Sequence, residues 1–291
     1  ANKNILKPGS GSPVIATSHD IALGCFWLTK TVPGSLGEGK HFQSPNAAIL
    51  AHDYGQIGIQ AKINVLPVEG KEKNAQFDGK SFETTVGRLL FNTALPSDYP
   101  FINENVTKKI LGRIITDSMK RYGLDAVPKI VNRVKDFGFE YATKSGVTWS
   151  LDDVSVPQAK GAVIDAARKK VAKIEQDYKD GLLSAEEKRR ISIESWHAVK
   201  LEVEKMVEEQ LDPESSAHDM IRSGARGSIG NLTEMAGMKG LIQDAAGETI
   251  EVPIISAMIE GLNPVEYFMS THGARKGLTD TALGTARAGY L

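Results

Sequence analysis

The sequence has little of what marks a secreted, membrane-spanning or metal-binding protein. Only Cys25 among the 291 residues is a cysteine, which excludes an internal disulfide framework and any zinc site built from several cysteines. No stretch approaches the roughly 18 apolar residues that a transmembrane helix needs. A single cysteine fits a reducing compartment, so we expect a cytoplasmic location.

An excess of charge of either sign is also missing. The 35 Lys and Arg residues balance 36 Asp and Glu residues, for a formal net charge of -1. This balance gives no overall attraction to nucleic acid or membrane and leaves only local patches for such contacts. The hydrophobic fraction of 41% and the charged fraction of 24% exclude wholesale disorder. At roughly 150 residues per domain, the length predicts about two compact units.

Both ends of the sequence lack terminal signals. Ala1 is not a Met, and no basic-then-apolar targeting segment follows it. The helical pattern that reaches Leu291 has no C-cap. We therefore expect both ends to be cut edges inside a longer chain.

The fold class predicted for the sequence is α+β. Apolar and polar residues alternate over 57–65, which is the period-two pattern of a half-buried strand. Over 107–137 the apolar residues recur at helical spacing, with Asn105 and Thr107 as candidate caps. Residues 1–157 show no strand–helix alternation of the kind that builds a parallel sheet.

Residues 158–211 are rich in Lys, Glu and Ala and predict an antiparallel helical hairpin of the coiled-coil type. Each predicted helix has an apolar stripe at helical spacing, formed by Val163, Ala167, Val171, Ile174 and Tyr178 in one and by Trp196, Val199, Val203 and Met206 in the other. Between the stripes, Ser184 and Glu187 have the spacing of a capping box. Because each stripe is narrow, we expect a seam between two helices and no deep core.

The last predicted element is a long helix with internal glycines. It opens at Asn263-Pro264, a cap residue followed by Pro at the first helical position, and runs to Leu291. Its glycines are Gly273, Gly277, Gly284 and Gly289. Each costs about 1 kcal/mol relative to Ala. Such a helix is soft, and its glycines either permit bending or let neighbouring protein pack closely.

Generic motifs carry little chemistry in this sequence. The run over 223–228 is rich in small residues, but it lacks the Lys and the spacing of a phosphate-binding P-loop. It fits either an anion-binding turn or a glycine turn that ends a helix. The six histidines are scattered and show no metal-ligand spacing.

Several short motifs follow one another in a fixed order. The first half contains Asn4-Ile5-Leu6, Ser18-His19-Asp20, Leu23-Gly24, Thr84-Thr85-Val86-Gly87-Arg88, Gly138-Phe139 and Ser145-Gly146. The second half contains Asp180-Gly181-Leu182-Leu183, Ser223-Gly224-Ala225-Arg226-Gly227-Ser228, Ala236-Gly237-Met238-Lys239-Gly240 and Tyr267-Phe268-Met269-Ser270-Thr271-His272-Gly273-Ala274-Arg275-Lys276-Gly277. In this order they resemble the large β′ subunit of bacterial DNA-directed RNA polymerase, over essentially the whole chain.

The resemblance implies three regions. Residues 1–157 are expected to form a pore-like α+β domain near the RNA 3′ end. Residues 158–245 are expected to form the rim-helix hairpin and funnel region of the secondary channel. Residues 246–291 are expected to be the start of the cleft domain with its bridge helix.

The resemblance also implies roles for individual residues. Arg226 and Arg222 are expected where nucleotides enter, although an Arg that bonds turn carbonyls would fit Arg226 equally well. The side of the bridge helix that faces nucleic acid is expected to carry His272, Arg275, Lys276, Gly277 and Thr285. Factor docking is expected at the hairpin tip, formed by Asp180, Gly181, Leu182 and Leu183.

The chemistry that the resemblance implies lies mostly outside this sequence. The family's catalytic Mg²⁺ is held by an aspartate-rich motif upstream of Ala1, so no catalytic or metal-binding residue is expected here and the fragment alone should be inactive. Its expected partners are the β, α, ω and sigma subunits, template DNA, the RNA transcript, nucleoside triphosphates and secondary-channel transcript-cleavage factors. No membrane partner is expected, and the expected location is cytoplasmic and nucleoid-associated.

Two alternatives to the polymerase-segment hypothesis use the same residues. In the first, the hairpin is a docking module for factors that enter the secondary channel, and this role is compatible with the segment hypothesis. In the second, the chain is a coiled-coil scaffold unrelated to transcription, which leaves the glycine-rich cationic helix over 263–291 without a purpose. Five residues depart from the family's usual pattern: His19, Thr233, Glu234, Gly284 and Arg287.

Overall fold

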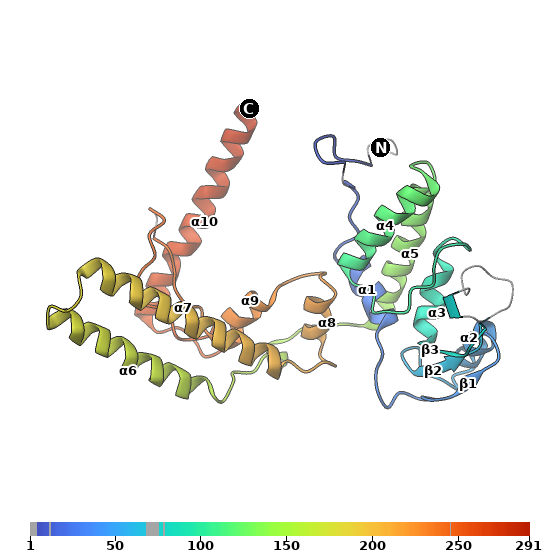
Figure 1. The fold of residues 1–291 in the computed structure, drawn as a ribbon, viewed down its shortest axis with the longest axis horizontal. Helices are drawn as coiled ribbons and strands as arrows, with labels where there is room; N and C mark the ends of the chain where they lie inside the picture. The colour runs from blue at the N-terminus through green and yellow to red at the C-terminus, as the bar shows by residue number, and fades with distance from the viewer. Residues whose placement is uncertain (1–4, 12, 68–75, 78, 245) are drawn as a thin grey trace. The chain divides into compact units, whose positions relative to one another are not determined.

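A computed structural model describes residues 5–11, 13–67, 76–77, 79–244 and 246–291 (Figure 1). Asn4, the first residue of the motifs quoted above, lies outside them. The chain divides into two compact units, the first comprising residues 1–148 and 213–227 and the second residues 149–212 and 228–291. The segment over 213–227 therefore belongs to the first unit, although it follows the predicted hairpin. The expected three-part division stays a prediction.

The first unit combines helices with a small sheet. Its elements are α1 (Asp20–Thr29), β1 (His41–Phe42), α2 (Pro45–Asp53), β2 (Lys62–Val65), β3 (Phe82–Thr85), α3 (Val86–Thr93), α4 (Lys108–Tyr122), α5 (Val127–Ser145) and α8 (Ser216–Arg222). Across both units, the described residues form mostly helices and one three-stranded mixed sheet. The α+β fold class is confirmed.

The sheet differs from its prediction in two ways. β2 covers only the end of the alternating pattern, because residues 57–61 form a turn in which the Gly58 amide donates to Leu36 O and the Ala61 amide to Gly58 O. β2 pairs antiparallel with β3 but parallel with β1, and α2 lies in the connection between β1 and β2. The expectation that no such strand–helix alternation exists was therefore wrong. β1 has two residues and is too short to show a periodic pattern.

The helical pattern over 107–137 is interrupted, so it forms two helices. Thr107 caps α4, its Oγ1 accepting from the Ile110 amide at 3.4 Å, which confirms one candidate cap. α4 ends where Gly123 adopts a φ of 73°, and α5 starts with Pro128 in its first turn. Asn105 is not a cap, because its Oδ1 accepts a hydrogen bond from Arg88 instead.

α1 and α5 pack closely because both carry a glycine at their contact. A Cβ built on Gly24 would overlap the Gly138 carbonyl oxygen, and a Cβ on Gly138 would lie 2.7 Å from Ile21 Cα. Helix packing therefore accounts for the Leu23-Gly24 and Gly138-Phe139 motifs. Cys25 lies beside this contact, and burial raises the pKa of its thiol to about 12, so it is not a reactive thiol.

The Thr84–Arg88 motif joins β3, α3 and the end of α1. Thr85 Oγ1 caps α3 by accepting from the Arg88 amide at 3.2 Å, and a Cβ on Gly87 would overlap the Leu28 carbonyl oxygen. The Arg88 guanidinium donates, at 2.9 to 3.2 Å, to Thr29 O, Thr31 Oγ1, Asn103 O, Asn103 Oδ1 and Asn105 Oδ1. Burial lowers the pKa of Arg88, and the carboxylates of Glu104 and Glu83 oppose that shift. This motif therefore has a structural role.

The second unit contains the hairpin and the long helix. Its elements are the 3₁₀ helix η2 (Leu151–Asp153), α6 (Lys160–Lys179), α7 (Ala185–Gln210), α9 (Ile229–Leu232), the π-helix η3 (Thr233–Gly237) and α10 (Pro264–Tyr290). α6 and α7 pack against each other as a hairpin (Figure 1). The predicted capping box is confirmed, since the Glu187 amide donates to Ser184 Oγ at 3.2 Å and the Ser184 amide to Glu187 Oε2 at 3.0 Å.

The hairpin is less isolated than its narrow stripes suggested. Val203 and Val207 of α7 pack against η3, where a Cβ built on Gly237 would lie 2.7 Å from Val203 Cγ1 and 3.2 Å from Val207 Cγ2. The α7 stripe therefore serves a second contact besides the seam with α6. The start of α6 is also anchored, because the buried Lys160 ammonium forms an ion pair with Glu260.

Candidate functional site

The run over 223–228 forms a glycine turn that ends α8. Ser223 is the C-cap, and Gly224, with a φ of 74°, donates its amide to Ile221 O at 3.1 Å. Arg222 is the last residue of α8, and the Arg226 amide donates to Met220 O at 3.4 Å. Both arginine side chains are exposed, and within the described part of the chain the Arg226 guanidinium has no hydrogen-bond or ion-pair partner. The turn thus holds its shape without using that guanidinium.

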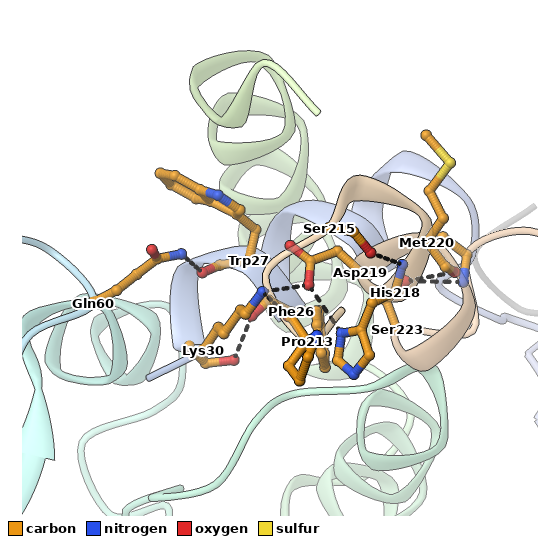
Figure 2. Close-up of polar contacts among 12 residues, drawn as sticks. Phe26, Trp27, Lys30, Gln60, Pro213, Ser215, His218, Asp219, Met220 and Ser223 are labelled. Atoms are coloured by element: carbon orange, nitrogen blue, oxygen red, sulfur yellow. Dashed lines mark hydrogen bonds and ion pairs between the residues drawn. The ribbon is translucent and has the colours of Figure 1, made fainter. Parts of the chain in front are cut away.

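The segment over 213–227, which carries these arginines, is tied to the rest of the first unit through a buried ion pair (Figure 2). Lys30 Nζ lies 2.6 Å from Asp219 Oδ1 and donates to Pro213 O at 2.8 Å. The two charged side chains are only 10% and 6% exposed. His218 Nδ1 lies 3.4 Å from the same Asp219 oxygen. A second tie is the hydrogen bond from the Lys108 amide to Ser223 O at 2.8 Å.

A basic groove of about 780 Å³ opens beside this segment in the first unit. Its basic lining residues are Arg222 and the first two residues of α4, Lys108 and Lys109, and apolar side chains such as Ile15 and Pro13 line the rest. The Lys108 and Ile110 amides already donate to Ser223 O and Thr107 Oγ1, so the positive charge of this helix start comes mainly from the two lysine side chains. The basic side chains of this groove suit an anionic ligand such as a phosphate.

The hairpin tip combines an aspartate that is hydrogen-bonded to α6 with an exposed leucine side chain. Asp180 is the C-cap of α6, and its Oδ1 accepts from Gln176 Nε2 at 2.9 Å. Gly181 adopts a φ of 77°, and the next side chain, Leu182, is 73% exposed, whereas Leu183 is half-buried. The Leu182 side chain is thus the most available apolar group of this tip.

Two basic residues near the tip are engaged within the second unit. Arg189 donates to Glu248 Oε2 and to Thr249 O, both at 3.1 Å. Lys188 lies 3.8 Å from a Glu251 carboxylate oxygen and over the Tyr178 ring. These contacts attach the start of α7 to the segment over 248–251.

α10 begins at a well-bonded N-terminus and is exposed over its second half. Asn263 caps it, with Glu266 completing a capping box, and every residue from 277 to 291 is exposed. Glu266 Oε1 also accepts from the Ile255 and Ser256 amides, at 3.1 and 3.2 Å. Burial acts to raise the pKa of Glu266, but hydrogen bonds from Ser256, Asn263 and Ile255 outweigh it and lower the pKa. Glu266 therefore ties the helix start to its neighbouring segment as a carboxylate.

The α10 residues expected to face nucleic acid have different surroundings. Arg275, Gly277 and Thr285 are exposed, and the Thr285 hydroxyl donates to Thr281 O at 2.9 Å. His272 packs edge-on against Phe268, with ring centroids 5.4 Å apart. Lys276 Nζ lies 3.5 Å from Asp280 Oδ2, so its charge is partly satisfied within the helix. The two arginines of the glycine turn are in the first unit, whereas α10 and the hairpin tip are in the second.

The described residues offer no metal centre. Over the described ranges, no group of three or more His, Cys, Asp or Glu side chains could hold a metal ion. These residues therefore do not fit the role of Mg²⁺ ligands. None of the helices formed by the described residues has the length and hydrophobicity needed to cross a bilayer.

Three family models match the chain in order. "RNA polymerase Rpb1, domain 3" matches residues 4–154, which is more than half of the chain. The chain belongs to the RNA polymerase Rpb1 family. Domain 4 of Rpb1 matches residues 159–264, and domain 5 matches residues 261–291.

Similar proteins include bacterial β′ subunits. "DNA-directed RNA polymerase subunit beta'" of Nocardioides sp. is 42% identical over 297 residues, covering 100% of this chain and 23% of the relative. The proteins of the same name from Acidothermus cellulolyticus and Caldanaerobacter subterraneus are each 41% identical, covering 100% of this chain and 23% and 26% of their own lengths. The chain spans about a quarter of the length of these relatives. The predicted resemblance to the bacterial β′ subunit is confirmed, for the part that corresponds to Rpb1 domains 3 to 5.

Sequence reasoning missed the residues that hold the glycine turn in place. Lys30 and Asp219 are 189 positions apart, and neither lies in a motif that pairs them. Lys108 and Lys109 were counted only as part of a helix. Two consecutive lysines at a capped helix start are an unusual placement for cations, and that signal was available in the sequence.

Proposed function

We propose that the chain is a working part of the catalytic β′ subunit of a DNA-directed RNA polymerase, a nucleotidyltransferase that transcribes DNA into RNA. The single observation that carries this proposal is the match of three consecutive Rpb1 domains over almost the whole chain. Under this proposal the partners are the other polymerase subunits, DNA, RNA and nucleoside triphosphates, at the nucleoid in the cytoplasm.

Mg²⁺ belongs to the complete enzyme in this proposal. The described residues do not provide ligands for Mg²⁺, so under this proposal its ligands come from outside this chain. The chain's own contribution is then to guide substrate and support the reacting ends. Isolated, it should not extend a primer on a template in the presence of Mg²⁺.

Guiding of incoming nucleotides is assigned to the glycine turn and its basic groove. Arg226 presents an exposed guanidinium that the turn does not use, and a guanidinium can bind phosphate oxygens in a bidentate manner. Arg222, Lys108 and Lys109 line the adjoining groove and add positive charge. Together they suit a triphosphate that approaches the active centre.

The test is steady-state elongation by the reconstituted enzyme with Arg226→Ala. The expected result is an increase of about tenfold in the apparent KM for nucleotides, equivalent to about 1.4 kcal/mol. Arg168→Ala is the matched control, because Arg168 is an exposed arginine on α6 whose partner Asp165 is one helical turn away. An unchanged KM and kcat for Arg226→Ala would overturn this role.

α10 is proposed to be the bridge helix that couples nucleotide addition to translocation. Gly277 supports this role, because it is an exposed glycine inside a helix and lowers the cost of local bending. Gly277→Ala should stiffen the helix by about 1 kcal/mol and change the pausing and translocation rates of the assembled enzyme. Unchanged elongation and pausing in a folded variant would overturn the bending role.

A second candidate function is factor docking at the hairpin tip. The observation that favours it is the 73% exposure of Leu182 among charged neighbours, an arrangement that suits a protein partner. Leu182→Ser should weaken stimulation by secondary-channel cleavage factors while basal elongation stays intact. Loss of basal elongation instead would show a structural role for the tip.

A further inference from the structure

We infer that Lys30 and Asp219 are positioning residues that hold the glycine turn, and with it Arg226, in the orientation needed to receive a nucleotide. This inference rests on the proposed nucleotide-guiding function of Arg226. It adds two residues that touch neither substrate nor metal and act through the backbone of residues 213–227.

The first argument is geometric. Lys30 is the C-cap of α1, where its amide donates to Phe26 O at 2.9 Å, so the buried helix α1 fixes the base of its side chain. From there the ammonium contacts the segment twice, at Pro213 O and at Asp219 Oδ1 (Figure 2). Asp219 lies in α8, one turn before Arg222. One side chain thus fixes both the start of the segment and its helix.

A second tie fixes the far end of α8. The Lys108 amide donates to Ser223 O, and Ser223 is fully buried. Ser223 Oγ donates to Met220 O at 3.0 Å and accepts from the Ala225 amide at 3.2 Å. The segment that leads to Arg226 is therefore held at the backbone carbonyls of Pro213 and Ser223 and at the side chain of Asp219.

Burial distinguishes this pair from ordinary surface ion pairs of the same unit. The Lys62–Glu83 and Lys144–Glu140 side chains are about half exposed, whereas those of Lys30 and Asp219 are at most 10% exposed. Water screens the exposed pairs, so they contribute little to fixing the position of the elements that carry them. A buried pair is sensitive to the loss of one partner, because the remaining charge is left unpaired. Removing one charge should therefore displace α8.

The experiment uses the assembled polymerase holoenzyme with Asp219→Asn or Lys30→Met, and Lys144→Met as the matched control from an exposed pair. The two buried-pair variants should raise the apparent KM for nucleotides by about threefold to tenfold with little change in kcat. Lys30→Arg, which keeps the charge and the donors, should stay close to wild type, as should Lys144→Met.

A second measurement follows the tie itself. Hydrogen exchange of the peptide over 105–111 reports the Lys108 amide, whose acceptor is Ser223 O. Asp219→Asn should speed this exchange, while Lys144→Met should leave it unchanged. This readout does not depend on activity, so it separates the inference from the nucleotide-guiding function on which it rests.

The outcomes divide as follows. If Arg226→Ala raises KM but Asp219→Asn and Lys30→Met do not, the positioning role is wrong and the proposed function stands. If Arg226→Ala leaves KM unchanged, the proposed function fails, and the inference about nucleotides fails with it even if exchange is faster. Should the single variants fail to assemble, Lys30→Met/Asp219→Leu leaves no unpaired charge but still removes the hydrogen bonds from Lys30 to Pro213 O and to Asp219, which are the ties that the inference requires. A wild-type KM for that double variant would overturn the inference.

Discussion

α1 and α10 are both helices with internal glycine, yet they are held in place by opposite means. α1 has ten residues, most of them buried, and Gly24 lies where another helix backbone touches it. α10 has 27 residues, of which only Glu266 and Ser270 are buried. The Gly277, Gly284 and Gly289 positions of α10 would each accept a Cβ with no described atom within 4 Å. Glycine thus marks close packing in α1 and open space at these three positions of α10, whereas a Cβ on Gly273 would lie 3.2 Å from Ile242 Cγ2.

The difference shows where each helix obtains its stability. α1 depends on tertiary contacts, since it has no side-chain cap at His19, which has a φ of 55°. α10 depends on its N-terminal capping box and on hydrogen bonds within one helix. It also leaves large apolar side chains exposed, including Val265, Tyr267, Phe268, Leu278 and Leu283. Such a surface fits a helix that contacts other parts of a larger enzyme, in keeping with the proposed function.

The largest expected effect comes from Gly24→Ala. The added Cβ would overlap the Gly138 carbonyl oxygen, and two packed helices would have to separate. We expect the free energy of unfolding of the 291-residue chain to fall by about 3 kcal/mol, measured by urea denaturation followed by circular dichroism.

The control for this comparison is Gly277→Ala in α10. There the Cβ has open space, so unfolding stability should rise by up to about 1 kcal/mol through helix propensity. Equal effects of the two substitutions would show that the distinction between the two helices is wrong.

A smaller loss is expected for Arg88→Lys. Lysine keeps the charge but not the planar fork that donates to four residues around the end of α1. Several acceptors would lose their donor, and stability should fall by about 2 kcal/mol. Arg113→Lys is the control, because Arg113 and its partner Glu104 are both at least half exposed. A loss as large for Arg113→Lys would argue against the special role of Arg88.

The smallest effect concerns the pH dependence of the α10 N-terminus. The pKa of Glu266 is lowered in the folded chain, so its contribution to stability is present above its unfolded pKa and is lost as pH falls through the folded pKa. We expect amide exchange at Ile255 and Ser256 to become faster, relative to the rest of the second unit, as pH drops below about 4. Glu266→Gln should weaken the hydrogen bonds from these two amides, lowering their protection against exchange by about 1 kcal/mol at neutral pH, and should remove this pH dependence. A pH dependence that survives in Glu266→Gln would assign it to another group.

Local signals in the sequence were enough to place several elements. Three helices begin where the sequence predicts them. Their caps are Thr107, Ser184 with Glu187, and Asn263 followed by Pro264. These features succeed because a capping side chain and the backbone amide that donates to it lie within three residues of each other. The ordered motifs identified the family for the same reason, since they can be recognised one segment at a time.

Tertiary structure alone decided the rest. Three contacts join residues that lie 57 to 189 positions apart in the sequence. They are the contact of Gly24 with Gly138, the hydrogen bond from Arg88 to Thr31 after the end of α1, and the ion pair of Lys30 with Asp219. The division into units likewise returns residues 213–227 to the first unit. Each contact pairs groups whose types are common along the chain, so only the fold selects which of them meet. The sequence determined the family and the capped helix starts. Contacts between buried residues far apart in the sequence decided which charges and glycines hold the candidate site in place.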